Sequence, residues 1–133
     1  MLARGETYVI HASGRVVWCT ITVPPGLAPA RGAAAGEKLG AFLIDHVLQR
    51  HSAWLGVVMD GRNGPTVVGP SSLRVMARIF ERAEQVRRRV AVIVSHGSML
   101  REQFSDLVQA PAREFINVTE SRDAALDWMT AER

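Results

Sequence analysis

Two adjacent serines, Ser71 and Ser72, follow a Gly-Pro pair and precede a regular apolar pattern in the stretch GPSSLRVM. Gly69 can cap a helix, Pro70 suits its first position, and either serine can accept a hydrogen bond from a backbone N–H group there. The same N–H groups carry partial positive charge, so a phosphate on one of these serines would be stabilised. The spacing therefore predicts a helix start and leaves open whether a serine also carries the function.

The elements that position these serines follow from the hydrophobic pattern. The stretch ETYVIHASGRVVWCTITV predicts a β-hairpin, and AWLGVVMD, RVAVIVSHG and REFINV predict three further strands. Apolar residues at helical spacing predict a helix from Gly36 to residues 50–52 and a second helix that begins at the serines. SMLREQFSDLVQ and SRDAALDWMTAER predict two more helices, with Ser98 and Ser121 as N-caps.

Two details of the first helix are expected from composition. Residues 24–36 are rich in Pro, Gly and Ala without an apolar period, which predicts a mobile loop of low order before the helix. His46 falls on the apolar stripe of the helix, so its imidazole is expected to lie in the core or to be partly buried.

An antiparallel hairpin followed by alternating helices and strands predicts an α/β fold. We expect a single mixed sheet of about five strands, the N-terminal hairpin plus parallel strands, with about four helices and right-handed crossovers. A chain of 133 residues is the size of one domain. Sites in such sheets form where loops leave the carboxyl ends of parallel strands. The residues expected to share that rim are Asp60, Arg62, Asn63, Ser71, Ser72, Ser95 and His96.

Composition and charge narrow the classes of function. The sequence contains no apolar run long enough to cross a bilayer and no signal-peptide pattern, which indicates a cytoplasmic protein without membrane insertion. The net charge of +3 comes from arginine, and only Arg87–Arg89 are clustered, at an expected helix end where cations are favoured. Nucleic acid is therefore not an expected partner. The single cysteine, Cys19, is expected to be a small core residue.

Catalysis and metal binding find little support in the sequence. Ser71, His96 and Asp60 could converge on one rim as in a serine hydrolase, but the G-x-S-x-G turn of the α/β hydrolases is missing. The MDGRNG segment has too few carboxylates for a calcium loop and lacks the Gly-Lys-Ser/Thr of a nucleotide loop. We therefore expect neither enzymatic activity nor a cofactor or metal. The histidines that lack a metal-site spacing are His11, His46 and His51.

From Glu6 to the C-terminus, the order of elements together with the GPSSLRVM segment resembles the STAS domain, the fold of anti-sigma-factor antagonists. In that family, a strand ending in Asp leads to a DSSGLxxL segment that opens a helix, and the second serine is the phosphoacceptor. Ser71 takes the acceptor place here, and Leu73 and Met76 take the two leucine places. RRVAVIVS, REFINV and AALDWM resemble the later elements of divergent bacterial members.

The segment also departs from the family pattern. Gly69 stands where the family has Asp, Pro70 where it has the first serine, and Ser72 where it has glycine. The family Asp helps the serine to be phosphorylated. The resemblance therefore implies the docking surface of the family more directly than it implies a phosphorylation switch.

The resemblance implies a signalling protein that regulates transcription by binding another protein, such as an anti-sigma factor or its kinase. Ser71, with Ser72 as the backup, would be the phosphoacceptor. If the switch has been lost, the surface could act as a scaffold or as a self-association face in a homodimer. The alternative is a non-enzymatic STAS-like protein that holds a small ligand or lipid between sheet and helices. The expected partner-binding residues are Asp60, Arg62, Asn63, Arg74, Arg78, Ser95 and His96.

Overall fold

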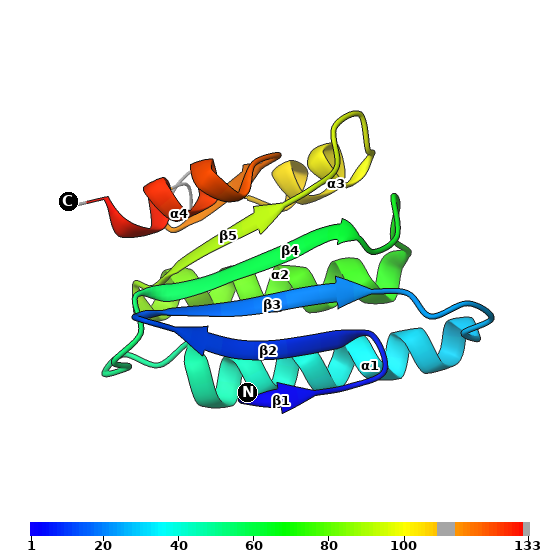
Figure 1. The fold of residues 1–133 in the computed structure, drawn as a ribbon, viewed down its shortest axis with the longest axis horizontal. Coiled ribbons are helices and arrows are strands. Elements are labelled where there is room, and N and C mark those ends of the chain that lie inside the picture. Colours follow the sequence, from blue (N-terminus) through cyan, green and yellow to red (C-terminus); the bar gives the residue numbers. More distant parts are fainter. Residues whose placement is uncertain (109–113, 132–133) are drawn as a thin grey trace.

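The computed structural model describes residues 1–108 and 114–131 and shows an α/β fold built on one mixed sheet (Figure 1). Within these residues the sheet has six strands in the order β1-β2-β3-β4-β5-β6. The first three strands pair antiparallel, and β3 to β6 pair in parallel. The strands are β1 (Ala3–Arg4), β2 (Tyr8–Ser13), β3 (Val16–Thr22), β4 (Gly56–Asn63), β5 (Arg89–Ile93) and β6 (Ile116–Thr119). The predicted fold class is confirmed, and the short edge strand β1 is an addition to it.

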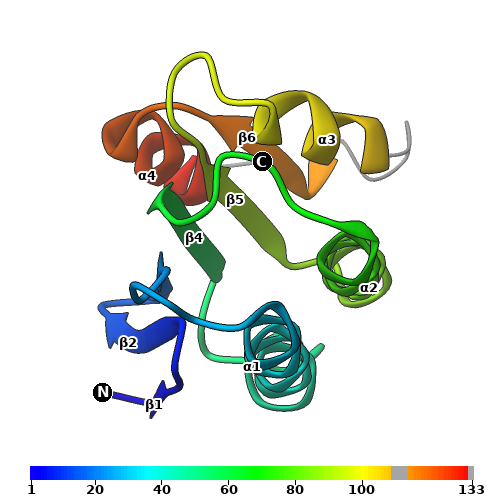
Figure 2. The same ribbon diagram turned by 90° about the vertical axis from the view of Figure 1, so that its right-hand side faces the viewer.

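The helices cover both faces of the sheet unequally. Figure 2 shows α1, α2 and α3 on one side and α4 on the other. Because β3 to β6 follow one another along the sheet, three crossovers of the same hand put their helices on the same face. No helix of the described chain is long and apolar enough to cross a membrane. The helices are α1 (Pro29–Phe42), the π-helical turn η1 (Leu43–Val47), α2 (Pro70–Val86), α3 (Leu100–Leu107) and α4 (Arg122–Thr130).

Two apolar layers hold the sheet between these helices. Alternate residues of a strand face opposite sides, so Val57 packs in the larger core beneath α1 to α3 and Val58 in the smaller core beneath α4. The same alternation directs Met59 into the larger core and Asp60 to the α4 side. Cys19 lies fully buried in the larger core, and desolvation raises the pKa of its thiol to about 12. This burial confirms the expectation that Cys19 is a core residue.

The helix start predicted near Gly36 is wrong, because α1 begins at Pro29 and includes most of the segment expected to be a loop. Pro29 occupies the first helical position, where proline is tolerated and its missing N–H costs nothing. The alanines that follow have the highest helix propensity of any residue, which offsets the glycines among them. Only residues 24–28 of the expected loop remain outside a helix.

The expectation for His46 is also wrong. Residues 43–47 form a π-helical turn, in which the Leu48 N–H donates to the Leu43 carbonyl oxygen at 2.8 Å, and the wider turn shifts the phase of the apolar stripe. Val47 is buried, as its place on the stripe predicts, and Leu48 enters the core in place of His46. The imidazole is exposed, with its ring centroid 5.0 Å from that of Phe42.

The clustered arginines Arg87–Arg89 lie at the end of α2, and two of them donate hydrogen bonds to main-chain carbonyls of other segments. Arg87 ends α2 in the left-handed conformation, and Arg88 donates to the carbonyl oxygens of Gln49 and Arg50. A guanidinium nitrogen of Arg89 donates to three main-chain carbonyl oxygens at the C-terminal end of α4. The cluster lies at the end of α2, as predicted, but the Arg88 and Arg89 side chains cap elements other than the predicted one, the segment after η1 and the end of α4.

Of the serine caps predicted for the last two helices, Ser121 is confirmed and Ser98 is wrong. The Ser121 hydroxyl accepts a hydrogen bond from the Ala124 N–H at 3.2 Å, as an N-cap should. The Ser98 hydroxyl accepts from the Leu100 N–H at 3.1 Å, but α3 begins one residue later than predicted, with Met99 as its N-cap. These two helix starts fix the ends of the loops that follow β5 and β6.

Candidate functional site

A cavity of about 560 Å³ lies at the carboxyl ends of the parallel strands, between the sheet and the first three helices. Its floor comes from consecutive strands and includes Ile21 of β3, Met59 of β4 and Val92 of β5. Residues of α1 and α2 form the opposite wall, and Leu100 and Phe104 of α3 contribute to the lining. The cavity therefore occupies the edge of the sheet where α/β proteins commonly bind ligands.

Small residues on α1 create much of this space. Gly32, Ala33 and Gly36 line the cavity at helical spacing. A Cβ atom added to Gly36 would meet no other atom within 4 Å. At Gly40, one turn further along, a Cβ would lie 2.7 Å from Cγ1 of Val75, so glycine lets α1 and α2 pack closely there. Sequence reasoning missed this wall because it assigned residues 24–36 to a loop.

Two exposed ion pairs attach the N-terminal part of α1 to its neighbours. Arg31 contacts Glu6 before β2, and Arg78 of α2 contacts Glu37, both at 2.6 Å. The hydrogen bond from Arg31 lowers the pKa of the Glu6 carboxyl below its ordinary value. Arg78, expected to face a partner, is thus engaged with α1.

A glutamine that the sequence did not single out holds another wall of the cavity. The Val68 N–H donates to Oε1 of Gln103 at 3.0 Å, and Nε2 of Gln103 donates to the Val68 carbonyl oxygen at 2.9 Å. Val68 lines the cavity in the loop between β4 and α2. The paired bonds fasten this loop to α3, and no sequence pattern connects residues so far apart along the chain.

The two serines line the cavity and do not cap α2. Gly69 is the N-cap and Pro70 the first helical residue, as predicted. Ser71 and Ser72 follow within the first turn, half-buried, and neither hydroxyl bonds to another residue of the described chain. The prediction that a serine side chain caps this helix is therefore wrong. Because Gly69 takes the extended conformation of the cap, the serines come too late in the helix for that role.

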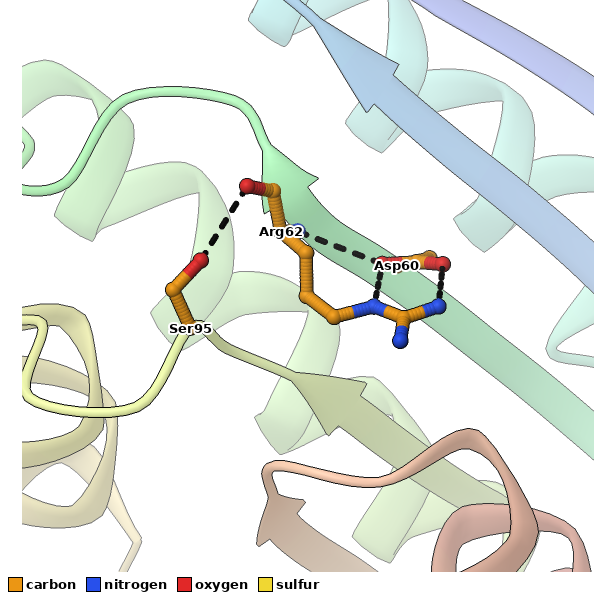
Figure 3. A network of polar contacts seen from close by, with 3 residues as sticks. All are labelled: Asp60, Arg62 and Ser95. Carbon is orange, nitrogen blue, oxygen red and sulfur yellow. Dashed lines mark hydrogen bonds and ion pairs between the residues drawn. The ribbon is translucent and has the colours of Figure 1, made fainter.

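The polar residues at the end of β4 form a separate network (Figure 3). Arg62 donates from Nε and from a terminal nitrogen to the two carboxylate oxygens of Asp60, at 3.0 and 2.8 Å. These bonds lower the pKa of the Asp60 carboxyl. The Ser95 hydroxyl donates to the Arg62 carbonyl oxygen at 3.1 Å. The network ties the end of β4 to the loop after β5, so three of the predicted rim residues do meet.

The remaining rim residues do not join the serines in a catalytic arrangement. His96 is exposed and pairs with Glu120 at 3.1 Å, and Asp60 faces the α4 side while Ser71 faces the cavity. Asn63 and Arg74 are exposed, at the end of β4 and on α2. No group of three potential metal ligands occurs within residues 1–108 and 114–131. The hydroxyl, imidazole and carboxylate of the serine-hydrolase alternative are therefore not assembled.

Comparison of the chain with models of protein families, with curated proteins and with solved structures finds no match. The resemblance to the STAS domain thus rests on the element order and the GPSSLRVM segment alone.

Proposed function

We propose that the protein is a non-enzymatic binding protein that holds a small, largely apolar ligand in the cavity between the sheet and α1 to α3. The observation that carries this proposal is the cavity itself. Its volume of about 560 Å³ falls within the range of about 300–1,000 Å³ typical of small-molecule sites. The sequence left open a STAS-like protein that holds a small ligand between sheet and helices. The cavity supports that alternative better than it supports an enzyme.

The chemistry of the lining supports an apolar occupant. The buried side chains around the cavity include Leu39, Met76 and Ile79, which offer no hydrogen bonds. Water in such a space finds few polar partners, whereas an apolar molecule would gain dispersion contacts and release water. The cavity is open to solvent on one side, where Val23 and Val67 are about half exposed, so a ligand can enter it without unfolding.

Titration with Nile red, a neutral dye whose fluorescence rises in apolar surroundings, tests this proposal. We expect saturable binding of one dye per folded chain, with displacement by naphthalene and a rise in the midpoint of thermal unfolding. The urea-unfolded chain serves as the control, because it retains the same apolar residues without the cavity. Dye fluorescence that does not saturate, or that is equal for folded and unfolded chains, would contradict the proposal.

Regulatory docking is the second candidate function, and one observation favours it. No acidic side chain lies in the first turn of α2, next to Ser71, so a phosphate there would meet a helix start without a competing negative charge. Arg74 is exposed one turn along the helix, and Val67 is 50% exposed in the preceding loop. The start of α2 and the loop before it are therefore accessible to a partner protein.

For this candidate, Ser71→Glu should weaken binding of an anti-sigma factor or its kinase by a few kcal/mol, because the added charge is unpaired at a desolvated contact. Ser71→Ala should bind like the wild type but should not respond to phosphorylation. Affinity capture with the three proteins as baits, followed by mass spectrometry, measures the difference. Identical retention of such a partner by all three would rule out the switch.

A further inference from the structure

We infer that Ser71 and Ser72 recognise an uncharged polar group of the ligand, so that the cavity takes a mostly apolar molecule with a hydroxyl, carbonyl or ester group near the start of α2. This inference rests on the proposed ligand-binding function and specifies the class of ligand. It also gives the two serines a role that helix capping does not provide.

The polar side chains around the cavity are few and unevenly distributed. Among the described residues that line it, the polar side chains are those of Thr7, Thr22, Ser71 and Ser72, and all of them are hydroxyls. Ser71 and Ser72 are adjacent on one helix turn, while the threonines lie on the hairpin side. A polar group of the ligand therefore finds its most concentrated set of partners at the two serines.

The hydroxyls of these two serines are available to bond to a ligand. A serine hydroxyl can both donate and accept a hydrogen bond, so one that faces a cavity without a protein partner is free to bond to a ligand. Neither serine hydroxyl bonds to another residue in the described ranges, and both residues are partly exposed where they line the cavity. A ligand oxygen placed between them would accept from one hydroxyl and, if it carries hydrogen, donate to the other.

Among the described residues, the lining of the cavity offers no counter-charge to an ionised ligand. The described lining contains no charged side chain, and Arg31 and Arg78 are already paired with carboxylates at the edges of α1. An ionised group that enters an apolar site without a counter-charge loses its hydration without compensation, which weakens its binding. Hydroxyl partners suit a neutral group, so the lining selects against cationic and anionic ligands of the same shape.

Competition against bound Nile red tests the inference with 1-decanol, decylammonium and decanoate, and with naphthalene as a probe that has no polar group. Wild type should bind 1-decanol at least about tenfold more tightly than either ion. Ser71→Ala/Ser72→Ala should bind 1-decanol about five- to tenfold more weakly, because two hydrogen bonds are lost, with unchanged affinity for naphthalene. Ser105→Ala, on the exposed side of α3, is the matched control and should behave as wild type.

The outcomes separate this inference from the function on which it rests. If the double variant binds 1-decanol as tightly as the wild type does, or if an ion binds as tightly as the alcohol, the serine-based selectivity is refuted while ligand binding stands. If naphthalene fails to displace the dye from the wild type, the proposed ligand-binding function fails and the inference fails with it.

Discussion

Gly36→Leu is expected to abolish ligand binding and at the same time to stabilise the fold. A side chain at this position would project into the cavity, since a Cβ there meets no other atom within 4 Å. The isobutyl group would occupy space that the ligand needs. Glycine is a poor helix former, so its replacement within α1 should raise the free energy of unfolding by about 1–3 kcal/mol through helix propensity and burial.

Nile red titration and urea unfolding of the same preparation measure both effects. Gly36→Ala is the matched control, because it should gain about 1 kcal/mol of stability while its single methyl group leaves most of the cavity open. A Gly36→Leu protein that binds the dye with wild-type affinity would show that the dye binds elsewhere. A Gly36→Leu protein that loses stability would show that the space above Gly36 is not available in solution.

Gly56→Ala should have the opposite effect on stability and is expected to be among the most damaging single methyl additions in the chain. Gly56 begins β4 beside Arg89 of β5, and a Cβ added there would overlap the Arg89 carbonyl oxygen and lie 3.0 Å from Sδ of Met129. The obstructing atom is main chain within a parallel ladder, which cannot move aside like a flexible side chain. We expect a loss of about 3 kcal/mol or more in the free energy of unfolding.

Urea unfolding of Gly56→Ala against Gly61→Ala measures this effect within the same strand. A Cβ on Gly61 would lie 3.4 Å from the Ile93 carbonyl oxygen, close to ordinary contact distance, so this control should lose less than about 1 kcal/mol. Failure of Gly56→Ala to fold is the extreme form of the expected result. Equal stability of the two variants would contradict the packing described for β4 and β5.

The fold was predictable where burial leaves a periodic signal in the sequence. Val57 and Val58 face opposite cores, so the run around them is apolar at every position and predicts a strand covered on both sides. The hairpin and the later helices also show clear hydrophobic periods in the sequence. The edge strand β1 was not predicted, because Ala3–Arg4 is too short to show a hydrophobic period.

The cavity was much harder to predict, because it exists where residues with small side chains, or with none, line α1. Gly32, Ala33 and Gly36 carry no hydrophobic period, and with the neighbouring prolines they predicted a loop. Pro29 and the alanines do favour a helix, but the glycines and prolines around them outweighed that signal in the sequence. The motif around Ser71 marked the right place in the chain, but only the structure places its side chain beside a cavity.

Methyl NMR of protein labelled at methionine tests the central claim, ligand binding within the cavity, most directly. Met59 and Met76 line the cavity, whereas Met129 lies in the core beneath α4 on the other face of the sheet and provides an internal reference. Addition of naphthalene should shift the Met59 and Met76 methyl signals in a saturable manner and leave Met129 in place. Unchanged signals at Met59 and Met76, or an equal shift at Met129, would contradict binding in this cavity.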